Sequence, residues 1–163
     1  MSRNDDRTGI KVKATNRKGL RDFFVEEKLE AGLVLTGSEI KSIRGGRASL
    51  VDSYATIEGG EAFVHGIHIP PYVQAGHYGH EPDRVRKLLL HKEEIKRLVG
   101  KIAERGYTLV PLRLYLKDGK AKVELGLARG RRQYDKRREM AERDADREMA
   151  RAERRRLRGP AER

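Results

Sequence analysis

The sequence predicts a mainly β protein, an OB-like small β-barrel with two or three short helices, followed by a basic C-terminal tail. Three observations favour this class: short β-like runs recur between glycine-rich breaks, two hairpin turns are legible, and helical spacing is confined to short segments of the body. A length of 163 residues suits a single core. We expect residues 1–8 to be disordered, 9–128 to form the barrel and 129–163 to form the tail.

The strands are predicted from composition and alternation. Runs rich in β-branched, aromatic and other apolar residues occupy 10–14, 23–35, 53–57, 61–69, 107–116 and 120–128. Glycine-containing turns at 58–61 and 117–120 predict two hairpins. In the last run an inward apolar set should alternate with an outward polar set; the inward residues are Ala121, Val123, Leu125 and Leu127, and the outward ones Lys120, Lys122 and Glu124.

Two helices are expected between the strands. Thr36 and Glu39 have the spacing of a capping box, and the helix that they begin should end at Gly45-Gly46. A second helix is predicted from Lys92 to Arg105, with Gly106 as its terminator. Its apolar face consists of Ile95, Leu98, Val99, Ile102 and Ala103.

Charge indicates the class of partner. The chain has 37 Lys and Arg against 25 Asp and Glu, a net charge of +12 and a pI near 10.1, which favours polyanions. We expect no membrane partner, because no apolar run is long enough to span a bilayer. The absence of cysteine excludes disulfides and thiolate metal sites, and a reducing cytoplasm is the simplest location.

Body and tail differ in physical character. Cut after Ala128, the two parts carry equal net charge although the tail is much shorter, and Leu157 is the only large aliphatic residue of the tail besides its methionines. A narrow stripe of Ala141, Ala145, Met149 and Ala152 would bury little area. We therefore expect the tail to be disordered in the free protein and helical when bound to a polyanion.

Three segments are candidates for nucleic-acid contact. Asn16-Arg17-Lys18-Gly19 offers an amide, two cations and a glycine in what reads as a loop, suited equally to gripping a phosphate backbone or to plain solvation. Arg84, Arg86 and Lys87 add cations on another connection. In the tail, Tyr134 stands among arginines and lysines, so it could stack on an unpaired base while the cations neutralise phosphates. We expect RNA rather than DNA as the partner.

Catalysis and metal binding are not expected. Five histidines are present, and His77 and His80 lie close together, but there is no HExxH spacing and no obvious third ligand. No carboxylate pair stands out as an acid and base, and no phosphate-cradling glycine loop or nucleophile elbow is present. We therefore predict no enzyme activity, no cofactor and no metal.

The ordered segments taken together resemble the small protein B family, the SsrA-binding proteins that carry transfer-messenger RNA (tmRNA) to stalled bacterial ribosomes. The resemblance runs from about Ile10 to Arg155, over NRKG, FFVEEKLEAGLVLTGSEIKSIRGGRASLVDSYA, GEAFVHGIHIPPY, RKLLLHKEEI, GYTLVPLRLYLKDGKAKVELGLARG and RRQYDKR. It implies an OB-like barrel that binds the tRNA-like domain of tmRNA. It also implies a tail that reads the empty decoding centre of the small ribosomal subunit and lies as a helix along the message channel.

Residue roles follow from the resemblance and from the charge pattern. The resemblance implies tmRNA contacts at Asn16, Glu30, Leu89 and Lys122, and we add Arg17, Lys18 and Lys87 as neighbouring cations. The decoding-centre residues would be Gly130, Arg131, Arg132, Tyr134, Asp135, Lys136 and Arg137. A carboxylate is repelled by phosphate, so Glu30 would either accept a hydrogen bond from a base or ribose or orient a neighbouring cation. Leu89 would serve packing or contact.

Competing functions make different predictions. A general structured-RNA-binding or ribosome-associated barrel would bind unrelated RNAs as well as it binds tmRNA. A metal-dependent nuclease would cleave RNA when magnesium is added. Under the tmRNA interpretation, elongation factor Tu and alanyl-tRNA synthetase would be reached through tmRNA.

Overall fold

A computed structural model describes residues 9–72, 79–104 and 106–157, and the side chains of 132–134 are not part of that description. The expected disorder of residues 1–8 lies outside the described residues. The elements follow the chain in this order: β1 (Ile10–Thr15), α1 (Arg17–Asp22), β2 (Phe23–Leu33), α2 (Gly37–Arg44), β3 (Tyr54–Glu58), β4 (Glu61–His65), β5 (Arg86–Leu89), α3 (Lys92–Ala103), β6 (Tyr107–Lys117), β7 (Lys120–Gly130) and α4 (Arg131–Leu157).

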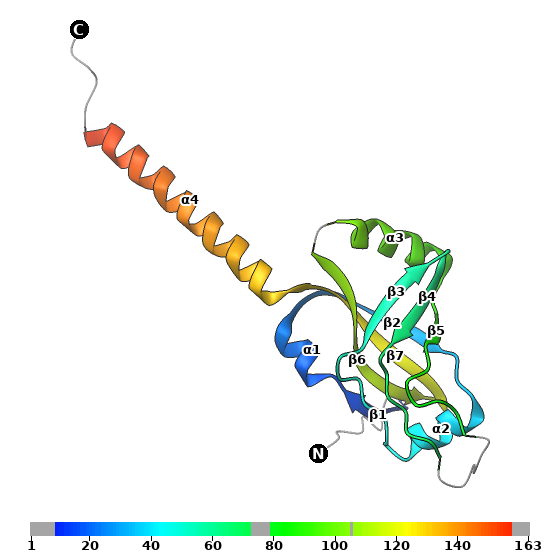
Figure 1. Cartoon of the computed structure of the whole chain (residues 1–163). Coiled ribbons are helices and arrows are strands. Elements are labelled where there is room, and N and C mark those ends of the chain that lie inside the picture. The colour runs from blue at the N-terminus through cyan, green and yellow to red at the C-terminus, as the bar shows by residue number, and fades with distance from the viewer. Residues whose placement is uncertain (1–8, 73–78, 105, 158–163) are drawn as a thin grey trace. The chain divides into compact units, whose positions relative to one another are not determined.

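The body is an antiparallel β-barrel (Figure 1). Its seven-stranded sheet has the order β1-β6-β3-β4-β5-β2-β7, and an additional β6–β7 pairing closes the ring, with β1 outside it on β6. The closure is uneven, since β6 and β7 pair from Tyr107 to Lys117 whereas β3 meets β6 at the single pair Ala55–Leu109. The predicted mainly β class is confirmed, and of the two or three short helices expected the described body has three, α1, α2 and α3.

Both predicted hairpin turns are confirmed. Gly59 and Gly60 have φ of 57° and 77° between β3 and β4, and Asp118 and Gly119 have φ of 51° and 77° between β6 and β7. Two consecutive residues with positive φ match the twist of an antiparallel hairpin, which is why glycine and aspartate occupy them. The turn chemistry alone therefore fixes which strands are neighbours at these two places.

Two strand predictions need correction. The strand expected at 61–69 ends at His65, because Gly66 has φ of +78° and a Cβ there would lie 3.1 Å from the Asp52 carbonyl oxygen. The short strand β5 was not predicted at all. With only Arg86–Leu89 in it, β5 has too few residues to show an alternation.

The predicted face of α3 is only partly right. Leu98 is completely buried in the main core, and Ile102 packs against that core. Val99 is 49% exposed, so the buried stripe is narrower than the sequence suggested. The helix ends at Ala103, and Gly106 follows with φ of +86°, as expected of a terminator.

Strand β7 shows the predicted alternation with one exception. Val123, Leu125 and Leu127 belong to the main core. Glu124, expected to point into solvent, is only 8% exposed, because Arg113 donates to its carboxylate at 2.7 Å and Lys28 lies 3.4 Å from the other oxygen. Cross-strand cations thus cover this carboxylate on the outer face.

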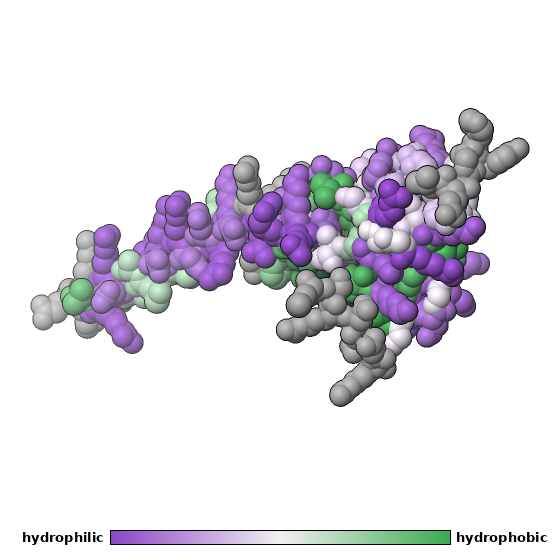
Figure 2. Space-filling view, turned by 90° about the horizontal axis from the view of Figure 1, so that it is seen from below, coloured by the Kyte–Doolittle hydropathy of each residue, from purple (hydrophilic) through white to green (hydrophobic). Residues whose placement is uncertain are grey.

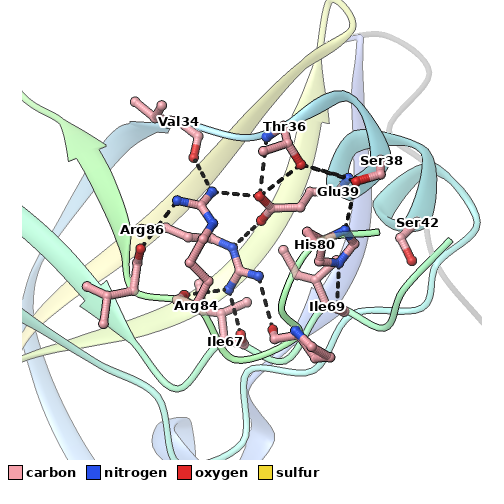
Figure 3. A network of polar contacts seen from close by, with 12 residues as sticks. Val34, Thr36, Ser38, Glu39, Ser42, Ile67, Ile69, His80, Arg84 and Arg86 are labelled. Atoms are coloured by element: carbon pink, nitrogen blue, oxygen red, sulfur yellow. Dashed lines mark hydrogen bonds and ion pairs between the residues drawn. The ribbon is translucent and has the colours of Figure 1, made fainter. Parts of the chain in front are cut away.

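A buried ionic network ties α2 to the long connection between β4 and β5 (Figure 3). The Glu39 side chain closes the predicted capping box with Thr36, and it also accepts hydrogen bonds from Arg84 at 2.6 Å and from Arg86. Arg86 and Glu39 are both fully buried. Arg86 further donates to the carbonyls of Ile67 at 2.7 Å and Pro82 at 3.0 Å.

This network overturns part of the charge interpretation. Arg84 and Arg86 were expected to be cations available on a connection, but both are committed to Glu39. A fully buried guanidinium cannot reach a phosphate, so Arg86 is structural. His80 joins the same region through Ser38 at 2.9 Å and the Ile69 carbonyl at 2.7 Å, while His77 lies outside the described residues.

The tail forms the single 27-residue helix α4. Every residue of α4 whose burial is described is exposed, and Figure 2 shows hydrophilic side chains along most of its length. The helix occurs because most of its residues are good helix formers, and Arg138 pairs with Glu142 at 3.0 Å one turn later. The tail is therefore helical in this structure, and its disorder in the free protein stays a prediction.

The boundary between the compact units lies after Gly130. Arg129 and Gly130 pair with Phe24 and Phe23 of β2, so these two residues continue the sheet. Among the described residues, no helix is long and apolar enough to cross a membrane.

Candidate nucleic-acid interface

Three neighbouring strands bring distant residues into one rung of the sheet. On β2, Gly32 pairs with Lys122 of β7 on one side and with Leu89 of β5 on the other. Glu30 lies two residues before Gly32, so it shares the same face of the sheet. The strand register therefore places Glu30, Leu89 and Lys122 together on the outer surface of the barrel.

A cleft of about 510 Å³ lies over this rung. It is lined by Glu30, Gly32, Leu89, Leu90, His91, Glu94 and Lys122. Leu89 is 55% exposed, so its apolar surface is open to a ligand. Three of the four residues that the resemblance assigned to tmRNA contact thus share one cleft.

Gly32 determines how close Leu89 can lie. A Cβ at position 32 would be 3.2 Å from the Leu89 Cβ and 3.4 Å from its Cδ1. Any larger residue on β2 would therefore push the leucine away from the strand. Gly32 does not stand out in the sequence, because its importance depends on the register between β2 and β5.

The Glu30 carboxylate is held by two side chains of β6, the strand on the far side of β7. The Tyr115 hydroxyl donates a hydrogen bond to it, and Lys117 Nζ lies 3.5 Å from its other oxygen. The hydrogen bond from Tyr115, aided by the nearby lysines 117 and 122, lowers the pKa of Glu30 below its ordinary value. Burial and this carboxylate together raise the pKa of Tyr115. Glu30 is therefore an oriented anion at neutral pH.

The cations of the surface differ in availability. Among the residues described, Lys122 makes no ion pair shorter than 4.0 Å, so its ammonium is open to a phosphate. Lys87 Nζ lies 2.9 Å from Glu61, and both side chains are about half exposed. An exposed pair of this kind exchanges easily for another anion. Lys122 is the stronger candidate for direct phosphate contact.

Asn16 and its neighbours do not form the loop that was predicted. Residues 17–22 are helix α1, and Asn16 is its N-cap, accepting from Gly19 N at 2.9 Å. Asn16 is only 3% exposed, and its amide donates to the Pro111 carbonyl at 2.9 Å. Asparagine is a favoured N-cap residue, which is the physical reason for the helix.

These contacts change what each residue can do. The Asn16 amide is occupied within the protein, so its direct effect is to anchor α1 against β6. Arg17 is exposed. Lys18 Nζ lies 2.8 Å from Asp52, whose hydrogen bond raises the pKa of Lys18. Only Arg17 and Lys18 of this segment can present charge to a ligand.

The predicted decoding-centre residues other than Gly130 belong to the second compact unit, which begins at Arg131. Gly130 ends β7, and Arg131, Asp135, Lys136 and Arg137 lie in α4, where the side chains of Arg131 and of residues 135–137 are exposed. The predicted contacts of Arg132 and Tyr134 lie outside the described side chains. The positive end of the helix dipole favours an anion at the start of α4. No acidic residue in the first turn of the helix provides that negative charge.

Within the ranges described, no three histidine, aspartate or glutamate side chains gather so as to hold a metal ion. The polar groups at the cleft are one ammonium, one imidazole and two carboxylates. Such a mixed set with an apolar neighbour suits hydrogen bonding and charge contact with a nucleotide.

Comparison with known proteins decides the family. The family model described as SmpB protein matches residues 13–155. The chain belongs to this family. An SsrA-binding protein of Geobacter sulfurreducens is 56% identical over 144 residues, which are 88% of this chain and 94% of the relative. One from Acidothermus cellulolyticus is 58% identical over 152 residues, 93% and 96% of the two chains.

A solved structure agrees with this membership. It carries the description "tmRNA-SmpB: a journey to the center of the bacterial ribosome" and superposes with a TM-score of 0.62 at 45% identity. The match covers 71% of this chain and 82% of that one. The resemblance to the SmpB family predicted from the sequence is confirmed.

Proposed function

We propose that this protein binds the tRNA-like domain of tmRNA through its barrel and delivers tmRNA to stalled ribosomes for trans-translation. The observation that carries the proposal is the shared cleft of Glu30, Leu89 and Lys122. These residues come from three separate segments, and the resemblance assigns RNA contact to each of them. Membership of the SmpB family and relatives named SsrA-binding protein support the same reading.

The chemistry of the cleft suits a folded RNA. Lys122 supplies an unpaired ammonium for a phosphate, and Leu89 supplies an exposed apolar contact for a base or ribose face. Glu30 is fixed by Tyr115 and Lys117, so it can accept a hydrogen bond in a set direction. Phosphate contacts release counterions, and affinity should fall with salt by a log-log slope of roughly 0.7–0.9 per contact.

The tail would contact a second RNA surface. Helix α4 exposes cations along its length and offers almost no apolar area for protein packing, which suits a polyanionic channel. We propose that Gly130, Arg131, Arg132, Tyr134, Asp135, Lys136 and Arg137 contact small-subunit ribosomal RNA at the decoding centre, with the remainder of α4 in the message channel. Tyr134 would stack on an unpaired base.

Other partners follow from this role. Elongation factor Tu and alanyl-tRNA synthetase would be reached through tmRNA, because both act on its tRNA-like portion. A ribosome-rescue adaptor works in the cytoplasm and performs no catalytic step itself. A general structured-RNA-binding role is less favoured, because family membership and the shared cleft both support tmRNA.

Binding and delivery can be tested separately. The full chain and a chain truncated after Gly130 are compared in two assays: affinity for tmRNA in competition with total tRNA, and peptide tagging on ribosomes stalled at a message end. We expect both proteins to prefer tmRNA and only the full chain to support tagging. Equal affinity for tRNA would contradict the tmRNA function, and normal tagging by the truncated chain would contradict the role of the tail. Magnesium-stimulated RNA cleavage would indicate a nuclease.

A further inference from the structure

Lys122 lies beside two carboxylates on the outer surface of the barrel and pairs with neither. Glu124 is two residues along the same strand, and Glu30 pairs with Glu124 across β2 and β7, one rung away from Lys122. Opposite charges at such neighbouring positions attract and stabilise a sheet. In the described part of the chain Lys122 makes no ion pair, although it is close enough to help lower the pKa of Glu30. Both carboxylates are therefore held by other partners.

Glu124 is held by cations from both neighbouring strands. Arg113 of β6 donates to one of its oxygens at 2.7 Å, and Lys28 of β2 lies 3.4 Å from the other oxygen. These two contacts neutralise the Glu124 carboxylate without Lys122.

Glu30 is held by a tyrosine that reaches over a strand. Tyr115 of β6 pairs with Lys122 of β7, whereas Glu30 is on β2, on the other side of β7. The hydrogen bond from the Tyr115 hydroxyl to Glu30 therefore spans β7, and the two outer strands are roughly 10 Å apart. Lys117 Nζ lies 3.5 Å from the second oxygen of Glu30. Both oxygens thus have partners on β6 rather than on Lys122.

Packing alone does not account for the Tyr115 hydroxyl. Leu114 and Leu116 belong to the main core, so the alternation of the strand places Tyr115 on the outer face of the barrel. Tyr115 is nevertheless only 5% exposed, and a phenylalanine ring would be buried equally well there. What the hydroxyl adds is its hydrogen bond to Glu30.

The two contacts to Glu30 differ in strength. The side chains of Lys117 and Glu30 are 41% and 39% exposed, so solvent screens their ion pair. A lysine also acts as a point charge on a flexible stem and fixes no direction. The hydrogen bond from the buried tyrosine to a charged acceptor is stronger and directional. Tyr115 is therefore the main restraint on where the Glu30 carboxylate points.

We propose that Tyr115 is a positioning residue for RNA binding: by holding the Glu30 carboxylate, it keeps the Lys122 ammonium free for a phosphate. The inference rests on the proposed RNA-binding function, in which Lys122 contacts a phosphate. Without the hydroxyl, Glu30 turns to Lys122 and neutralises the charge that the RNA needs. Tyr115 acts through Glu30 and touches no RNA itself.

Tyr115→Phe tests the inference because it removes a hydroxyl and no charge. The affinity of the full chain for a transcript of the tRNA-like domain of tmRNA is measured over a range of salt concentrations. We expect binding to weaken roughly two- to fivefold, because the new pair of Glu30 and Lys122 would contribute no more than an exposed ion pair. The salt dependence should also become shallower, since one ammonium no longer displaces counterions. A loss of packing alone would not change the salt dependence.

Glu30→Gln supplies the decisive background. Glutamine carries no charge that could capture Lys122, so adding Tyr115→Phe to Glu30→Gln should change neither the affinity nor the salt dependence further. An equal loss in both backgrounds would show that Tyr115 acts through the fold and not through Glu30. That result, or unchanged binding by Tyr115→Phe alone, overturns the proposal.

Tyr107→Phe is the matched control. Tyr107 begins β6, and its hydroxyl donates to another carboxylate of β2, that of Glu26, at 2.6 Å. We expect Tyr107→Phe to bind the transcript with the affinity and salt dependence of the wild type, and a loss like that of Tyr115→Phe would overturn the proposal. Thermal unfolding checks that both variants are folded.

A crystal structure of Tyr115→Phe tests the positioning without RNA. It should show the Glu30 carboxylate paired with Lys122, and a carboxylate that stays with Lys117 alone would overturn the proposal.

Failure of this inference differs from failure of the proposed function. If the wild type prefers tmRNA to total tRNA and Lys122→Ala weakens binding while Tyr115→Phe does not, the inference fails and the proposed function stands. If the wild type does not distinguish tmRNA from total tRNA, the proposed function fails, and the crystal structure still decides whether Tyr115 holds Glu30 away from Lys122.

Discussion

Neutralising Glu39 of α2 should destabilise the protein more than neutralising an exposed glutamate of the sheet. In Glu39→Gln, the Arg86 guanidinium stays completely buried but faces a neutral amide. Breaking a buried ion pair costs about 3–5 kcal/mol. The carbonyls of Ile67 and Pro82 still accept from Arg86, so we expect a value near the lower end, about 3 kcal/mol.

The matched control is Glu61→Gln. Glu61 pairs with Lys87 at 2.9 Å, but both side chains are about half exposed, and such pairs contribute about 0–1 kcal/mol. Urea unfolding of the full chain, followed by tyrosine fluorescence, measures both variants. With an m-value of about 1–3 kcal/mol/M, the midpoint of Glu39→Gln should fall by roughly 1–3 M. A midpoint close to that of Glu61→Gln would refute the reasoning.

The buried ion pair of Glu39 and Arg86 also predicts that stability depends on pH. Burial alone would raise the pKa of Glu39, but hydrogen bonds from Arg84 and Arg86 outweigh it and lower the pKa below the ordinary value of 4.5. A lowered carboxyl pKa contributes stability that is complete above the unfolded-state value and is lost as the pH falls through the folded-state value. The stability difference between wild type and Glu39→Gln should therefore shrink as the pH falls below 4.5, and a constant difference would contradict this account.

Three further outcomes are expected. Gly32→Ala should displace Leu89 and destabilise the protein by about 1–3 kcal/mol while weakening tmRNA binding, whereas Gly37→Ala, which meets nothing within 4 Å, should do neither. Tyr115→Phe should raise the pKa of Glu30, measured by carboxyl NMR titration, because the strongest hydrogen bond that lowers it is removed. Amide exchange over residues 135–155 should be fast in the free monomer, since the side chains there are exposed, and strong protection would show that α4 is stable alone.

Local sequence patterns predicted the structure correctly where all the determining residues lie within one short segment. The capping box of Thr36 and Glu39 and the two positive-φ turns were read correctly, because their determinants lie within four residues. A loop was predicted at Asn16, because asparagine followed by Arg-Lys-Gly suits one, although asparagine is also a favoured N-cap residue. The hydrogen bond from the Asn16 amide to the Pro111 carbonyl, 95 residues away, favours the helix over the loop. No pattern within the segment predicts that contact.

The candidate site depended on long-range register. The rung that joins Lys122, Gly32 and Leu89 is defined by pairings between β7, β2 and β5. No residue spacing within one segment encodes those pairings. For the same reason, the sequence could not distinguish Arg86, whose partner lies 47 residues away, from a cation on the surface.

The uneven closure of the barrel has a consequence for how the chain folds. Strands β6 and β7 are adjacent in sequence and pair along their whole length, so their contacts require little loop-closure entropy and can form early. The Ala55–Leu109 junction joins residues far apart in the chain by one pair and should form late. Substitutions at the Asp118-Gly119 turn should then slow folding, whereas substitutions at Ala55 should mainly speed unfolding.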